Sequence, residues 1–194
     1  MLRVATATAP SCEDRVAVRK IPGGVAVIVA DGDAARRVVE LAQRGMSAHG
    51  FDALSARAHV NLLCEIDRDL RSGDASAVSL TVWQRHIWGA SVGDCSALVA
   101  HERGLDDLTE NRIRWSRIGT GNARPVPFER GEWDGCVVMA SGNLVGNVGP
   151  AAVRRVVFEG DIERAARRLV QRMGASQGEQ TPDVTVATVR WADR

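Results

Sequence analysis

The chain has 194 residues, of which 45% are apolar and 25% are charged, and its formal net charge is +1. This length and composition are typical of one soluble domain with a single sizeable core. A charge so close to zero excludes the basic footprint of a nucleic-acid-binding protein and a polybasic membrane patch. No apolar run approaches the length of a membrane span, and the N-terminus lacks the apolar core of a signal peptide. The four cysteines lack metal-binding or redox spacing, so we expect reduced thiols in a cytoplasmic protein.

Strands and then helices are predicted in the first third of the chain. The segment LRVATATA is β-prone, and RVAVRKIPGGVAVIVA predicts two strands around a Pro-Gly-Gly turn. The second of these strands is continuously apolar, which indicates burial on both faces. Helical spacing of apolar residues begins at Ala34, and a second helix fits residues 51–71.

The apolar period changes to two in the middle of the chain. SAVSLTVW, HIWGASVG and CSALVAHE are strand-like segments with short connections. Residues 102–134 are polar and weakly patterned, so we expect short strands and loops there. CVVMA is another buried strand and leads into the glycine-rich SGNLVGNVGP. Helical spacing returns over residues 150–173, and VTVATVRW closes the chain as an alternating strand.

The order of these elements predicts the fold class. Helices do not alternate one by one with strands, which argues against a doubly wound parallel sheet. An α+β domain with antiparallel sheets and segregated helices fits the order better.

Acidic residues cluster at the ends of the predicted strands. They are Glu13, Asp14, Asp31, Asp33, Asp94 and Asp183. Carboxylates that converge at strand ends repel each other unless a cation neutralises them, and oxygen ligands suit Mg²⁺ or Mn²⁺. At any single position, the preference of Asp for turns and helix N-caps is the simpler explanation. Because four junctions in one chain are acidic, a metal site is favoured.

Six motifs occur in a distinctive order along the chain. They are CEDRVAV, VAVIVADGDA, GDASAVSLTV, GASVGDCSALVAHERG, DGCVVMASGNL and PDVTVATVRW. Their order and spacing resemble the metal-dependent serine/threonine phosphatases of the protein phosphatase 2C (PPM) type, and the length resembles the smallest bacterial members, which act in stress and sporulation signalling. The resemblance implies a single phosphatase-like domain over residues 1–194. It further implies a four-layer αββα sandwich of two antiparallel sheets flanked by helices, with a binuclear metal centre at one end of the sheets.

The resemblance also implies roles for the acidic residues. Asp31 would bridge two metals, and the backbone carbonyl of Gly32 would be a further ligand. Glu13 matches the acidic ligand near the N-terminus, Asp14 matches its outer-shell neighbour, and Asp183 is the candidate ligand before the last strand. Asp31 and Asp14 are therefore the candidate catalytic residues. The implied reaction is hydrolysis of phosphoserine or phosphothreonine in a protein by water that Mn²⁺ or Mg²⁺ activates.

Two ligand positions depart from the family pattern. Gly142 stands where the family has a ligand Asp, and Pro182 stands at another ligand position, with Asp183 one residue late. The Arg that many members place before the N-terminal acidic segment is also absent. The second metal subsite should therefore be weak or empty. Two alternatives follow: a phosphatase of low activity, or an inactive pseudophosphatase that acts as a binding or regulatory module in bacterial signalling.

Several other residues receive more modest predictions. We expect Glu13, Asp14, Asp31, Asp33 and Asp183 to lie close together at one end of the sandwich. Asp33 is expected mainly to cap the following helix. Asp94 is expected either to bind an outer metal ion or to serve only as a turn residue. Cys95 is expected to serve packing. The four histidines show no ligand spacing and are expected at surface or half-buried positions.

Overall fold

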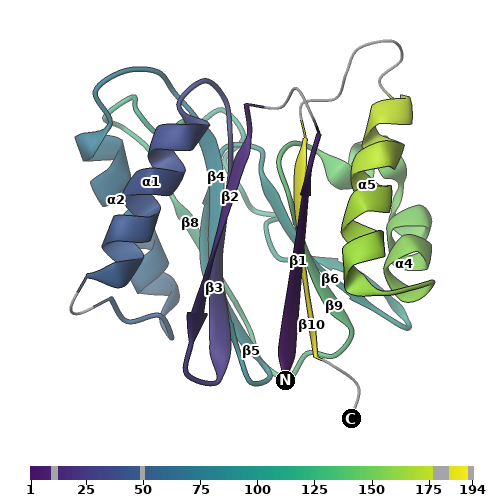
Figure 1. Cartoon of the computed structure of the whole chain (residues 1–194). Helices are drawn as coiled ribbons and strands as arrows, with labels where there is room; N and C mark the ends of the chain where they lie inside the picture. Colours follow the sequence, from purple (N-terminus) through teal and green to yellow (C-terminus); the bar gives the residue numbers. More distant parts are fainter. Residues whose placement is uncertain (10–12, 49–50, 177–183, 192–194) are drawn as a thin grey trace.

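Two stacked β-sheets with helices on both outer faces form the structure (Figure 1). The computed structural model describes residues 1–9, 13–48, 51–176 and 184–191. One sheet has the strand order β1-β10-β9-β6-β7 and the other has the order β2-β3-β4-β5-β8. All of the pairings are antiparallel. The predicted α+β class and the αββα sandwich are therefore confirmed.

The elements follow the predicted order. The strands are β1 (Leu2–Thr8), β2 (Arg15–Ile21), β3 (Gly24–Asp31), β4 (Ser76–Trp83), β5 (His86–Val92), β6 (Ser96–His101), β7 (Gly104–Asp107), β8 (Val126–Arg130), β9 (Cys136–Ala140) and β10 (Thr185–Trp191). The helices are α1 (Ala35–Ser47), α2 (Ala56–Asp69), α3 (Leu144–Val148), α4 (Pro150–Phe158) and α5 (Ile162–Ser176). No helix within these described ranges is long and apolar enough to cross a membrane.

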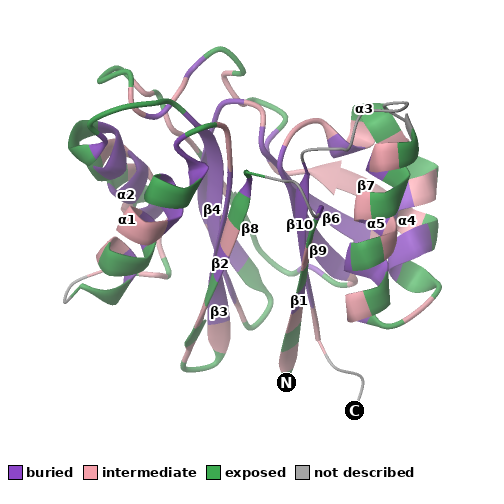
Figure 2. Cartoon of the chain, turned by 45° about the horizontal axis from the view of Figure 1, so that its top comes forward, coloured by how far each residue is buried: buried purple, intermediate pink, exposed green. Residues whose placement is uncertain are grey.

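The continuously apolar strand β3 is buried on both faces, as its sequence predicts. Its odd-numbered residues from Val25 to Val29 pack between the two sheets. Its even-numbered residues from Ala26 to Ala30 pack in the layer beneath α1 and α2. Figure 2 shows the same pattern in the central strands of both sheets, which are buried, whereas the helices expose their outer faces. The strands that carry the acidic residues are thus held rigidly between two apolar layers.

Two helix predictions need correction. Helix α2 begins at Ala56 rather than near residue 51, because the Asp52 carboxylate accepts the Leu54 N–H at 3.1 Å and forms a turn instead. The short helix α3 was not predicted in the glycine-rich segment. The side chain of Asn143 caps it by accepting the Gly146 N–H at 3.0 Å.

The prediction for the histidines is wrong at His59, which is 0% exposed on the inner face of α2. Its ring nitrogens lie 2.9 Å from Ser79 Oγ and 3.2 Å from Thr81 Oγ1, both on β4. These hydroxyls satisfy a polar ring that would otherwise be costly to bury.

One end of the sandwich gathers the acidic junctions. Antiparallel pairing brings the starts of β2 and β4 together with the end of β3. The turn between β5 and β6 and the end of β9 lie at the same end, because Ala77 pairs with Val92 and Ser96 pairs with Ala140. We call the region of Asp14, Asp31, Asp74 and Asp94 the acidic end.

Candidate metal centre

The centre is built around Asp14 and Asp31, which neighbouring strands position. Asp31 is the last residue of β3, and Asp14 directly precedes β2. Arg15 pairs with Ala30, so Asp14 and Asp31 flank the same end of the ladder. The Arg15 guanidinium donates to the backbone carbonyls of Glu13 at 2.9 Å and Asp14 at 2.8 Å, which fixes the entry of the chain into β2.

Asp14 is buried, and Asp31 lies half-buried beside it. Asp14 is 0% exposed, and neither of its carboxylate oxygens has a hydrogen-bond partner among the described residues. Burial, and next the interacting Asp14 carboxyl group, raise the pKa of Asp31 to about 8, and Asp94 adds to this shift. The two carboxyl groups interact, but no hydrogen bond of normal geometry joins them within the described chain. Such a pair is stabilised in its charged form by a bound cation.

The donor set suits a hard cation. Mg²⁺ is commonly held by one or two carboxylates, with waters and substrate phosphates completing the shell. Among the described residues, no three His, Cys, Asp or Glu side chains group closely enough to form a metal site. Two carboxylates and a carbonyl are therefore the described ligands available. This set fits Mg²⁺ or Mn²⁺ with several retained waters, and it does not fit a closed protein cage.

Gly32 contributes a constrained backbone to this centre. Its φ is +113°, and a Cβ at this position would lie 2.8 Å from the carbonyl oxygen of Asp74, so only glycine fits. The Gly32 carbonyl accepts the Ala35 N–H at 2.9 Å. A carbonyl oxygen has a second lone pair, so this bond leaves it able to bind a cation.

A second acidic group lies beside the first and is neutralised by the protein. Asp94 Oδ1 accepts a hydrogen bond from Ser76 Oγ at 2.8 Å. The Arg117 guanidinium also bonds Ser76 Oγ, lies 3.7 Å from Asp94 Oδ1 and lies 4.0 Å from Asp74 Oδ1. Asp94 thus has protein partners, in contrast to Asp14.

The predicted residues differ in their placement. The structure brings Asp14 and Asp31 together, whereas the side chain of Glu13 is exposed. Asp183 lies outside the described residues, so its predicted position stays a prediction.

The prediction that Asp33 caps the following helix is wrong. The N-cap of α1 is Ala34, with no side-chain cap. Asp33 instead accepts the Asp74 N–H at 2.8 Å. Its carboxylate therefore ties the end of β3 to the segment that precedes β4.

Gly142, which stands where the family motif has a ligand Asp, is surrounded by open space. Its φ is +66°, and an added Cβ would meet nothing within 4 Å. Its carbonyl accepts a hydrogen bond from Ser96 Oγ at 3.3 Å. The neighbouring Cys95 is a buried thiol whose pKa is raised well above its usual value by burial and then by Asp31, Asp94 and Asp14. Cys95 is 0% exposed, in agreement with a packing role. Gly142 is thus close to the centre and contributes no carboxylate to it.

Sequence reasoning missed Arg117 and Ser76. Arg117 lies in the weakly patterned segment 102–134, where no periodicity marks it. Ser76 lies in the motif GDASAVSLTV, but only its pairing with Asp31 in the folded sheet places it beside the acidic residues. Asp67, which anchors the Arg117 loop from α2, was also missed because its partners are more than 50 residues away.

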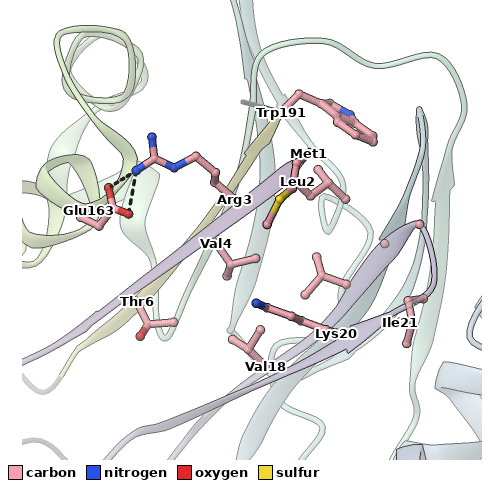
Figure 3. A pocket seen from close by; sticks show the side chains of 13 residues that line it. Met1, Leu2, Arg3, Val4, Thr6, Val18, Lys20, Ile21, Glu163 and Trp191 are labelled. Atoms are coloured by element: carbon pink, nitrogen blue, oxygen red, sulfur yellow. Dashed lines mark hydrogen bonds and ion pairs between the residues drawn. The ribbon is translucent and has the colours of Figure 1, made fainter. Parts of the chain in front are cut away.

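A groove of about 600 Å³ lies elsewhere, between the edge strands β1 and β2 (Figure 3). Its lining is mainly apolar and includes Leu2, Val4 and Val18, and the Arg3–Glu163 ion pair of 3.0 Å borders it. The groove is at the end of β2 and β3 where their hairpin turns, away from Asp14 and Asp31. It is therefore separate from the candidate metal centre.

Comparison with known proteins defines the fold. No protein-family model matches the chain, and no curated protein matches it in sequence. The S. agalactiae serine/threonine phosphatase is similar at a TM-score of 0.82 and 16% identity, over 99% of this chain and 100% of that chain. Stp1 from Staphylococcus aureus is similar at a TM-score of 0.80 and 16% identity, over 100% of this chain and 95% of that chain. The catalytic domain of the phosphatase PstP, solved with two manganese ions, is similar at a TM-score of 0.71 and 16% identity, over 99% of both chains.

These similarities show that the chain has the fold of the PPM-type serine/threonine phosphatases. The fold predicted from the six motifs is thus confirmed. At 16% identity the comparison establishes architecture, and the chemistry has to be argued from the residues of this chain.

Proposed function

We propose that this chain, as one domain over residues 1–194, is a metal-dependent protein serine/threonine phosphatase. The observation that carries the proposal is the buried carboxylate of Asp14, which has no hydrogen-bond partner among the described residues and lies next to Asp31 at the strand ends of a phosphatase fold. A buried carboxylate without a partner is costly, and a bound cation removes that cost.

The proposed ligands are Asp14, Asp31 and the Gly32 carbonyl, with Glu13 and Asp183 as further candidates. Mn²⁺ or Mg²⁺ bound there would supply Lewis-acid activation of the attacking water and of the phosphoryl oxygens. The protein's own contribution is rigidity: Asp31 ends a strand packed on both faces, and Gly32 is locked against Asp74. Support for manganese comes from PstP, which was solved with two manganese ions.

The proposed substrates are phosphorylated serine and threonine side chains of proteins in bacterial signalling. The serine/threonine phosphatases with the same fold support this substrate class. A cytoplasmic location is proposed with it, since Cys64, Cys95 and Cys136 are free thiols, as in a reducing compartment.

Hydrolysis of p-nitrophenyl phosphate and of a phosphothreonine peptide, with Mn²⁺, Mg²⁺ or a chelator, tests the proposal. We expect hydrolysis that depends on metal and falls by at least about 100-fold in Asp31→Asn, because even outer-shell changes cost 10–100-fold. Asp69→Asn on the exposed side of α2 is the matched control and should retain activity. Equal activity in Asp31→Asn and the parent would overturn the proposal. Metal binding without any hydrolysis would favour the inactive binding module.

A further inference from the structure

The acidic end already contains one positive charge that the protein supplies. Arg117 reaches it from the segment between β7 and β8. Its guanidinium bonds Ser76 Oγ and lies within 4.0 Å of the carboxylates of both Asp74 and Asp94. Ser76 pairs with Asp31 across the β3–β4 ladder, so the guanidinium lies beside the candidate metal centre.

Backbone contacts hold the loop in place on the C-terminal side of Arg117. Ile118 forms an antiparallel bridge with Ala75, with N–H to carbonyl distances of 2.9 and 3.1 Å, and Ile118 is 0% exposed. The neighbouring residues 119–123 are fixed by Asp67, whose carboxylate accepts three backbone N–H groups at 2.6, 3.1 and 3.0 Å. An arginine held in this way has a defined position, unlike a surface side chain that loses entropy in each contact.

The pair Asp74 and Asp94 therefore differs from the pair Asp14 and Asp31 in its protein partners. Asp94 has a hydroxyl and a guanidinium as partners, and Asp74 has the same guanidinium. The Asp14 carboxylate has no hydrogen-bond partner among the described residues. A metal ion at Asp94 would have to displace Ser76 and approach a fixed like charge. A metal ion between Asp14 and Asp31 meets the carboxylate oxygens of Asp14, which have no hydrogen-bond partner among the described residues.

We propose that Arg117 is a built-in counter-ion that takes the place of a metal ion at Asp74 and Asp94, so that metal binds at Asp14 and Asp31 alone. This inference rests on the proposed function, since it concerns the same centre. It assigns to Arg117 a positioning role: the guanidinium limits the number of ions and sets the affinity at the neighbouring carboxylates.

Calorimetric titration with Mn²⁺ of the full chain tests this role. We expect a single site in the parent protein. Arg117→Gln should gain a second site and bind the first ion roughly tenfold more tightly, because a like charge beside the centre has been removed. Arg117→Lys keeps the charge and should behave as the parent. Arg114→Gln, which removes the same charge from an exposed position on the same segment, is the matched control.

Thermal melting provides a second readout that a loss of folding alone would not mimic. Without metal, Arg117→Gln should melt below the parent, because Asp74 and Asp94 lose their counter-charge. Mn²⁺ should reverse that loss and raise the melting temperature of Arg117→Gln by more than it raises that of the parent. If Arg117→Gln does not fold, Asp94→Asn replaces it. This variant should weaken Mn²⁺ binding by no more than about tenfold, the effect of one neighbouring charge, and should keep the binding site, as expected for a residue that is not a ligand.

The outcomes separate this inference from the proposed function. Identical binding by Arg117→Gln and the parent, a second site already present in the parent, or a large loss of affinity in Asp94→Asn would overturn the inference and leave the phosphatase proposal standing. Binding by Arg117→Gln alone would support the counter-ion role and contradict the proposed function of the parent. Absence of binding in both proteins would overturn both.

Discussion

At the scale of single residues, Gly142 is the position at which this centre lacks a third carboxylate ligand. The position has room for a Cβ, and Asp tolerates positive φ better than most residues. The sequence identified this departure from the family motif, because the strand CVVMA fixes the alignment up to residue 140. The open space around it could be seen only in the folded chain.

Gly142→Asp is therefore predicted to strengthen metal binding. The added carboxylate should raise Mn²⁺ affinity at least about tenfold, since hard-cation affinity follows the number and charge of oxygen ligands. In a chelator the same variant should melt at a lower temperature, because it adds a like charge near Asp31 and Asp94. Calorimetry and melting measure the two effects. Gly149→Asp, at a similar φ of +82° with equally open surroundings, is the control, and equal affinity gains in both variants would contradict the prediction.

His59 is the residue for which a pH dependence is predicted. Burial lowers its pKa from 6.5 to about 4. The unfolded chain therefore binds more protons between these values, so the free energy of unfolding rises with pH. The stabilising contribution of neutral His59 is complete above about pH 6.5 and is lost as the pH falls towards about 4. Its size is about 3 kcal/mol by linkage.

Urea unfolding between pH 4 and pH 7 measures this contribution. We expect the slope of stability against pH to be smaller in His59→Gln than in the parent. His86→Gln, which changes an exposed histidine, should keep the parent's slope. A parent-like slope in His59→Gln would show that other groups cause the acid sensitivity. The sequence could not predict this buried histidine, because its partners Ser79 and Thr81 are 20 and 22 residues away.

At the scale of elements, strands were easier to predict than the segments between them. The strand β3 follows from a short apolar run that is rich in valine, which favours a strand buried on both faces. The start of α2 and the helix α3 depend instead on local side-chain bonds of Asp52 and Asn143, which compete with simple apolar periodicity. The loop of Arg117 depends on Asp67 of a distant helix, and no local pattern encodes such a contact.

Asp67→Asn is predicted to loosen this loop. An amide cannot accept three N–H groups in the geometry of a carboxylate, and we expect a loss of about 2 kcal/mol in the free energy of unfolding. Hydrogen exchange at Gly119, Gly121 and Ala123 should accelerate more than exchange in β3. Asp69→Asn, on the exposed side of the same helix, should change stability by less than about 0.5 kcal/mol. Unchanged protection at the three amides would show that the bridge of Ile118 and Ala75 holds the loop without Asp67.

At the scale of the whole molecule, the sandwich brings distant segments to one end. The resemblance of the six motifs predicted the two sheets, the flanking helices and the end at which Asp14 and Asp31 meet. It did not predict that Asp33 binds the backbone of Asp74, nor that Arg117 neutralises Asp94. Both depend on side-chain directions in loops, which the order of strands and helices does not determine.

The metal centre is tested most directly by anomalous X-ray scattering from crystals of the parent protein soaked in Mn²⁺. We predict a peak in contact with the carboxylates of Asp14 and Asp31, and no peak on Asp94, where Arg117 supplies the charge. A map with manganese on Asp94, or with no manganese beside Asp31 at saturating concentration, would contradict the account.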